Sequence, residues 1–290
     1  MATVQFRGKG RLTIWMGGVA SRFTQEADCR PVPGARLSVS LNDRVGRWMW
    51  AGCYELELVA LLKHLLDVEM TFVDVGAQVG YFSIIAAALV GDRGMVQSFE
   101  PDPDNFARLA ANARAYPWVT AHNSAVGDRT GEIDFYRSPI KTESGWGALF
   151  NEDGKRERVT TQICTLDSWA PAAGIERIDL LKMDVEGAEY RVLEGAQALI
   201  AKTRPVMWVE ANEVCLARDG KSVAMLLQRL AGWDYVTQGV WDKRTRSMQN
   251  IVAIPKERND LIGKLGRAKL GLRPAPAAGS MDVARASAQR

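Results

Sequence analysis

The chain has 290 residues, of which 47% are hydrophobic and 24% charged, a composition typical of a soluble globular protein with one main core. No apolar run approaches the roughly 20 residues that span a bilayer, no secretory signal is recognisable, and the four cysteines stand singly. We therefore expect a cytoplasmic protein with neither a transmembrane segment, a disulfide framework nor a zinc site. The net charge is +3, but residues 256–290 contribute +5, which argues against a nucleic-acid partner for the rest.

The apolar patterns alternate along the chain between strand-like and helix-like periods. Residues 1–50 hold short β-type pieces between Gly and Pro turns, which predicts an accessory β-rich region. A helix is expected over 54–66. Strands are then expected over 71–75, 95–99, 119–123, 178–183 and 206–209, and helices over 79–90, 102–116 and 222–231. This alternation predicts a doubly wound, mostly parallel α/β sheet.

Three segments depart from the alternation. A β-rich insertion follows the third strand, and its polar loop 138–157, with Trp146 near the centre, is expected to form a lid. The stretches 233–238 and 250–255 have no helix between them, which predicts an antiparallel hairpin at the sheet edge. The tail is expected to be disordered from about Arg273 onward. The predicted domains are thus 1–50, 51–255 and a basic tail over 256–290.

The stretch TFVDVGAQVG, residues 71–80, reads as strand, tight turn and helix, an arrangement that presents a ligand at the carboxyl end of a strand. Gly76 and Gly80 allow the backbone to approach that ligand closely. The pattern differs from the dinucleotide fingerprint G-x-G-x-x-G, because Gln78 stands where a middle glycine could be. Asp74 would repel a pyrophosphate, so the expected ligand carries an ammonium group, as S-adenosylmethionine (SAM) does.

The next strand supports a nucleoside ligand over an ordinary strand–helix turn. It ends in Glu100, twenty residues after Gly80. An acid at the tip of the second strand binds ribose hydroxyls in folds of this kind.

A second informative stretch is IDLLKMDVEGAEYRVLEGA, residues 178–196. An apolar strand brings Lys182 and Asp184 to the sheet edge where ligands bind, and Glu186 follows in the turn. Glu210 ends the neighbouring strand. Carboxylates converging in one cleft repel each other, and Lys182 offsets part of their charge.

Asp184 is the first candidate for the base that accepts a hydroxyl proton, followed by Glu210 and Glu186. The same oxygens, with Asn212, would suit Mg²⁺ or Ca²⁺. Metal-free base catalysis is the favoured interpretation, so no metal ligand is assigned and a divalent metal stays an alternative.

Tryptophans near the cleft have two interpretations. Trp48 and Trp50 either stack against a sugar or ring of the ligand, or pin the N-terminal region to the core.

The chain resembles the FkbM-type SAM-dependent methyltransferases over roughly residues 45–255. The stretches that carry the resemblance are GCYELEL, TFVDVGAQVGYFS, SFEPDPDNFARLAAN, NSAVGD, TLDSW, IDLLKMDVEGAEYRVLEGA and MWVE. The resemblance implies a class I methyltransferase, Rossmann-like fold for residues 51–255 and mostly O-methylation of sugars, polyketides and related natural products.

The resemblance also implies roles for individual residues. It places Asp74, Gly76 and Gly80 at the methionine end of SAM, with Gln78, where the family usually has Asn, beside it. Glu100, followed by Pro101, would bind the ribose. Ser124 and Ala125 would flank the adenine, and Asp184 and Glu186 would border the acceptor.

The sequence therefore predicts an O-methyltransferase that converts SAM to S-adenosylhomocysteine (SAH) and methylates a hydroxyl of a sugar, glycan or natural-product intermediate. Two alternatives stay open: methylation of a carboxylate, and a non-catalytic SAM-fold scaffold in a glycan assembly complex. Methylation of nucleic-acid bases is disfavoured, because the stretch at Asp184 is DVEG and not of the N/D-P-P-Y/F type. A homo-oligomer is left open.

Overall fold

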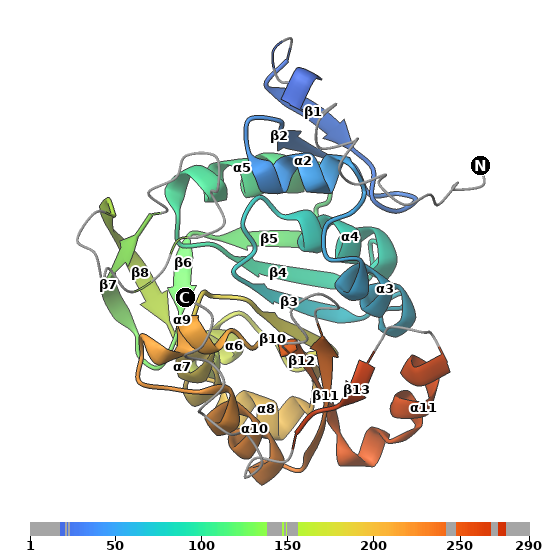
Figure 1. The fold of residues 1–290 in the computed structure, drawn as a ribbon, viewed down its shortest axis with the longest axis vertical. Helices are drawn as coiled ribbons and strands as arrows, with labels where there is room; N and C mark the ends of the chain where they lie inside the picture. The colour runs from blue at the N-terminus through green and yellow to red at the C-terminus, as the bar shows by residue number, and fades with distance from the viewer. Residues whose placement is uncertain are drawn as a thin grey trace.

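The computed structural model describes residues 18–20, 22, 24–137, 147, 149, 156–241, 248–267 and 272–276. Its centre is an eight-stranded sheet with the strand order β13-β11-β12-β10-β9-β3-β4-β5 (Figure 1). The parallel strands are β3 (Thr71–Val75), β4 (Met95–Phe99), β5 (Val119–His122), β9 (Leu180–Met183) and β10 (Val206–Glu210). The prediction of a mostly parallel α/β fold is confirmed.

Alternate residues of the central strands face two separate cores, because successive side chains of a strand point to opposite faces. Phe72, Leu180 and Trp208 belong to one core, whereas Val73, Leu181 and Met207 belong to the other. Burial on both faces explains why these strands read as near-continuous apolar runs. Elements contributing to the first core include α2 (Arg44–Trp50), α3 (Leu56–Leu65), α4 (Tyr81–Val90) and α11 (Asp260–Arg267). Those contributing to the second include α6 (Leu166–Ala172), α7 (Glu189–Glu194), α8 (Gln197–Thr203) and α10 (Val223–Gly232).

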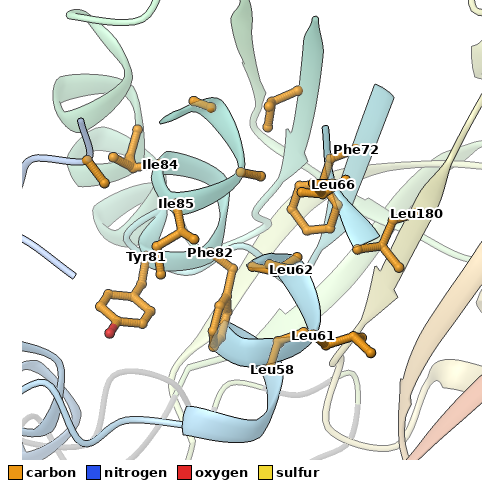
Figure 2. Close-up of a cluster of buried hydrophobic side chains, with 14 of the residues drawn as sticks. Leu58, Leu61, Leu62, Leu66, Phe72, Tyr81, Phe82, Ile84, Ile85 and Leu180 are labelled. Atoms are coloured by element: carbon orange, nitrogen blue, oxygen red, sulfur yellow. The ribbon is translucent and has the colours of Figure 1, made fainter. Parts of the chain in front are cut away.

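The first core holds α3 against α4 close to the ligand-binding edge of the sheet. Figure 2 shows the α3 leucines beside aromatic and aliphatic residues of α4. Leu58, Leu61 and Leu62 are fully buried, so the face at spacing i, i+3, i+4 points inward as predicted. This packing fixes the segment just before α3, which contributes to the site described below.

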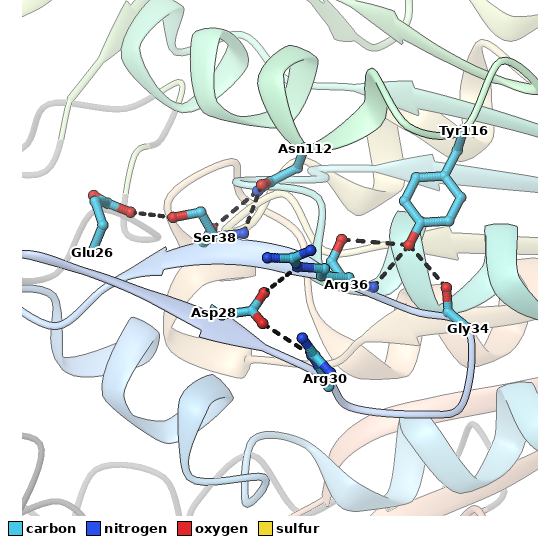
Figure 3. A network of polar contacts seen from close by, with 8 residues as sticks. All are labelled: Glu26, Asp28, Arg30, Gly34, Arg36, Ser38, Asn112 and Tyr116. Carbon is cyan, nitrogen blue, oxygen red and sulfur yellow. Dashed lines mark hydrogen bonds and ion pairs between the residues drawn. The ribbon is translucent and has the colours of Figure 1, made fainter.

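The N-terminal strands β1 (Glu26–Cys29) and β2 (Leu37–Ser40) form an antiparallel hairpin beside α5 (Pro103–Ala113) (Figure 1). Asn112 accepts a hydrogen bond from the backbone N–H of Ser38 at 2.8 Å and donates to the carbonyl of Val79 at 2.8 Å. The Tyr116 hydroxyl accepts from the N–H of Arg36 at 2.8 Å and donates to the carbonyl of Gly34 at 2.9 Å (Figure 3). The hairpin is thereby tied to the main domain.

The antiparallel hairpin at the sheet edge is confirmed as β11 (Tyr235–Trp241) paired with β12 (Met248–Pro255). The prediction of disorder from about Arg273 is wrong for the first residues of that stretch. β13 (Leu272–Pro274) pairs with β11 and extends the edge. Before it, α11 buries Leu261 and Leu265, whose i, i+4 spacing gives the basic tail an apolar face.

The β-rich insertion forms a small sheet of its own, in the order β6-β8-β7. Its strands are β6 (Ser124–Val126), β7 (Gly131–Tyr136) and β8 (Arg158–Cys164). Two short helices absent from the prediction precede and follow β10: α8, given above, and α9 (Glu213–Ala217). Within the described ranges, no helix is both long and apolar enough to cross a membrane.

Candidate functional site

A cavity of about 260 Å³ lies at the carboxyl ends of β3, β4, β9 and β10. Parallel sheets place ligand sites at this edge, since the strand-to-helix turns there bring polar groups together. Most of the residues predicted from the sequence line it: Gly76, Gln78, Glu100, Pro101, Ser124, Ala125, Lys182, Asp184, Glu186 and Glu210.

Glu100 is the anchored carboxyl of the site. Its Oε2 accepts the backbone N–H of Gln78 at 2.8 Å, and its Oε1 accepts that of Asp102 at 2.9 Å. The side chain is 5% exposed, and burial raises the pKa of Glu100 to about 7 despite these hydrogen bonds. The side chain of Asn105 also hydrogen-bonds this carboxyl group, which with the two backbone donors fixes it at the cavity wall as an acceptor for ligand hydroxyls.

Asp74 lies behind the cavity, and its expected role at the methionine end stays a prediction. It is fully buried and does not belong to the described lining of the cavity. Ser83 donates to its Oδ2 at 2.7 Å, and the ammonium of Lys182 lies 3.2 Å from its Oδ1. β3 is buried along its whole length, so this carboxylate supports Lys182 from within the fold.

Lys182 joins this buried support to the cavity. Its Nζ donates to the carbonyl of Gly76 at 2.7 Å and lies 3.7 Å from Asp184 Oδ2. Burial alone would lower the pKa of Lys182, but attraction to Asp74, Asp184 and Glu55 outweighs it and raises the pKa above its ordinary range. The ammonium therefore stays charged and holds Asp184 at the cavity wall.

The glycines of the first turn serve backbone packing. A Cβ on Gly76, whose φ is +79°, would lie 1.9 Å from the carbonyl oxygen of Asp184, so only glycine lets the two turns meet. Gly80 does not belong to the described cavity lining, and its expected place at the methionine end stays a prediction. It caps α4 with φ +88°, and Leu109 of α5 packs where its side chain would be.

Two residues with a strained backbone conformation, one glutamine and one glutamate, also line the cavity. Gln78 and Glu186 have φ angles of +51° and +54°, a conformation that non-glycine residues adopt at an energetic cost. Asn is among the residues most tolerant of this conformation, which gives a physical reason for the Asn that the resemblance led us to expect where Gln78 stands.

The carboxyl groups near Asp184 are buried and repel one another, which raises the pKa values of two of them. Burial raises the pKa of Glu186 to about 7, with repulsion from Asp184 adding to it, and the thiol of Cys215 donates to its Oε2 at 3.5 Å. Burial and the charge of Asp184 raise the pKa of Glu210 well above its ordinary value. The Oε2 of Glu210 is buried without a hydrogen-bond partner among the described residues.

Glu189 belongs to the turn and does not line the cavity among the described residues. Its Oε1 accepts the backbone N–H groups of Val185 at 3.0 Å and Gly187 at 3.3 Å. The 1% exposed side chain therefore fastens the turn that presents Asp184 and Glu186.

The structure adds lining residues that the sequence reasoning missed, namely Tyr54 and Glu55 before α3 and Arg44 of α2. The only signal for the first two was the GCYELEL stretch. Trp48 lines the cavity with Arg44 5.3 Å from its ring centre, and its stacking against a ligand stays a prediction. Trp50 packs against the first core, as the second interpretation expected.

Only a small part of the predicted lid belongs to the described residues. Trp146 and most of 138–157 lie outside the described residues, but Gly147 and Leu149 line the cavity. In the described part of the chain, no group of three or more His, Cys, Asp or Glu residues is arranged to hold a metal ion.

Comparison with known proteins gives a consistent family match. A family model described as the methyltransferase FkbM domain matches residues 74–237. The chain is 30% identical to the 2-O-methyltransferase NoeI of Sinorhizobium fredii, over 48% of this chain and 63% of that protein. It is 28% identical to the hexuronic acid methyltransferase AglP of Haloferax volcanii, over 60% of this chain and 67% of that protein. It thus spans about two thirds of the length of these curated relatives.

Among solved structures, a methyltransferase FkbM from Methylobacillus flagellatus aligns with a TM-score of 0.44 at 16% identity, covering 72% of this chain and 54% of the other. The α/β fold is assigned from the strand order and the parallel strand pairing described above.

Proposed function

The chain belongs to the FkbM methyltransferase family, and from this premise we propose that it is a SAM-dependent O-methyltransferase whose acceptor is a hydroxyl group of a sugar or glycan. One observation carries the proposal. A single cavity has Glu100, suited to ribose hydroxyls, and also the carboxyl group of Asp184 beside Lys182, suited to an acceptor hydroxyl.

The residues present fit SAM. Bound SAM supplies a methyl group on a positively charged sulfonium, which the carboxyl-rich cavity favours electrostatically. The two oxygens of Glu100 are preorganised by backbone N–H groups to accept the ribose hydroxyls. The cavity volume of about 260 Å³ lies just below the roughly 300–1,000 Å³ usual for small-molecule sites.

The acceptor side favours a neutral hydroxyl over a carboxylate. Asp184, Glu186 and Glu210 line one part of the cavity, and burial together with repulsion from Asp184 raises the pKa values of the latter two, which argues against a further negative charge there. A carboxylate acceptor would add a negative charge where three carboxyl groups already compete. The name of one relative, a hexuronic acid methyltransferase, supports a sugar acceptor, but a hexuronic acid carries both hydroxyls and a carboxyl group, so carboxylate methylation is kept as the alternative.

The proposal is tested by methyl transfer from isotopically labelled SAM, using the purified protein. The acceptor panel holds sugar nucleotides, methyl glycosides of neutral hexoses and a methyl glycoside of a hexuronic acid. We expect a base-stable methyl ether on a sugar hydroxyl. A base-labile ester would support carboxylate methylation instead, and SAH binding without turnover of any acceptor would support the scaffold.

Glu100→Ala is expected to weaken SAH binding by about 1–3 kcal/mol, because buried ribose hydroxyls would lose their acceptor. Isothermal titration calorimetry measures the affinity, and circular dichroism checks the fold. Asp92→Ala, at an exposed position after α4 that does not line the described cavity, is the matched control and should bind as the wild type does. An unchanged affinity in Glu100→Ala would remove Glu100 from the cofactor site.

A further inference from the structure

Glu55 has an energetically unfavourable backbone conformation. It directly precedes α3 with φ +37° and ψ +59°, the left-handed conformation, in which a glutamate is strained. Residues at this position of a helix usually cap it through a short side chain, but Glu55 makes no side-chain capping bond. Neither backbone geometry nor helix capping accounts for a glutamate here.

The side chain of Glu55 instead faces the cavity. It lines the cavity together with Tyr54, Asp184 and Glu210, and its Oε2 is buried without a hydrogen-bond partner among the residues that the structure describes. Buried carboxyl oxygens are nearly always satisfied, so such an atom in a cavity wall is suited to a ligand.

The neighbours of Glu55 place it on the acceptor side. Asp184 and Lys182 exert the largest charge effects on Glu55, and Glu55 in turn helps to raise the pKa of Glu210, so it lies among the groups assigned to the acceptor. Its position is fixed by aromatic packing, since the Tyr54 ring stacks on Phe82 at 5.7 Å and meets Tyr81 edge-on at 5.6 Å.

We propose that Glu55 contacts the acceptor, by a hydrogen bond to a sugar hydroxyl next to the one that is methylated. The proposal rests on the proposed function and names a residue that lies before the family match at 74–237. Adjacent hydroxyls on a sugar ring can each donate and accept a hydrogen bond. With Asp184 at the hydroxyl that is methylated and Glu55 at its neighbour, two contacts would fix the orientation of the ring.

The protonation of Glu55 supports this geometry. Burial, followed by repulsion from Asp184, raises the pKa of Glu55 to about 8, against the opposing effects of Lys182 and a hydrogen bond from Tyr54. At neutral pH the carboxyl group therefore carries its proton and can donate to a sugar oxygen as well as accept from a hydroxyl.

The test compares Glu55→Gly and Glu55→Gln with Lys63→Gln, at an exposed position on the same helix that does not line the described cavity. Glycine relieves the left-handed strain, so Glu55→Gly should keep or raise the melting temperature while raising the acceptor KM about tenfold, the loss of one hydrogen bond to substrate. SAH affinity should stay unchanged in all variants, Glu55→Gln should retain part of the acceptor affinity, and Lys63→Gln should match the wild type.

Saturation-transfer NMR on the SAH-loaded protein provides a binding readout with the panel sugar that the wild type binds most strongly. Weaker sugar binding by Glu55→Gly with unchanged SAH affinity supports the proposal. Equal sugar binding by variant and wild type, or a lowered melting temperature with unchanged acceptor KM, overturns it. A wild type that binds sugar without methylating it contradicts the proposed function alone, and one that binds none contradicts both.

Discussion

Lys182→Met is expected to lower the free energy of unfolding by about 3–5 kcal/mol, because it leaves Asp74 as an uncompensated charge inside the fold. Asp74 is 0% exposed and the Lys182 side chain 2% exposed, so water cannot replace the lost ammonium. Methionine keeps much of the length and apolar volume of the lysine stem, so the effect reports the charge. Urea unfolding followed by circular dichroism measures it.

Lys202→Met is the control, since Lys202 is exposed on α8, and its effect should stay within about 0.5 kcal/mol. Asp74→Ala should also destabilise the protein, because it removes the buried carboxylate that compensates the Lys182 ammonium. Equal stability of Lys182→Met and the wild type would show that the buried pair contributes nothing to the fold.

The pH dependence of this pair follows from the direction of the lysine shift. The pKa of Lys182 is raised in the folded state, so its contribution is complete below the ordinary lysine pKa and is lost only as the pH rises through the raised value. No loss of this contribution is expected near neutral pH.

The sheet could be predicted because its strands are buried on both faces and its turns contain glycine and acidic residues. β3 and β4 have the predicted bounds, whereas β9 begins at Leu180, two residues later than predicted. Disorder was wrongly predicted for the first residues after Arg273 because a short edge strand such as β13 depends on the partner that it pairs with. The helix that buries Leu261 and Leu265 was not predicted.

The strand-end rule located the candidate site but could not say which side chains face the cavity. Asp74 and Val75 are adjacent in β3, yet only Val75 lines the described cavity, because neighbouring side chains on a strand point in opposite directions. Glu55 escaped prediction for a different reason. It reaches the site through the packing of Tyr54 on α4, a tertiary contact that leaves no local periodic pattern.

Asp184→Asn is expected to lower kcat by roughly 10²–10⁴ with SAH affinity retained, because an amide cannot accept the proton of the acceptor hydroxyl. We propose Asp184 as the base because of its position. Its side chain is 24% exposed at the cavity wall, and Lys182 holds it from behind at 3.7 Å. Steady-state kinetics with the best acceptor of the panel measure the effect. Glu194→Gln, on α7 and paired with Arg229 away from the described lining, should retain the wild-type kcat.

EDTA treatment of the wild-type protein decides whether Asp184 acts as a base or as a ligand of a divalent metal. We propose the metal-free path for two structural reasons. Asn212, the neutral oxygen donor expected to join a metal site, caps α9 by accepting the backbone N–H groups of Val214 and Cys215. Lys182 already supplies a positive charge next to Asp184, which reduces the need for a cation there. Treatment with EDTA should then leave kcat unchanged. If EDTA abolishes turnover and Mg²⁺ or Mn²⁺ restores it, Asp184 acts as a metal ligand and the acceptor hydroxyl is acidified by the metal instead.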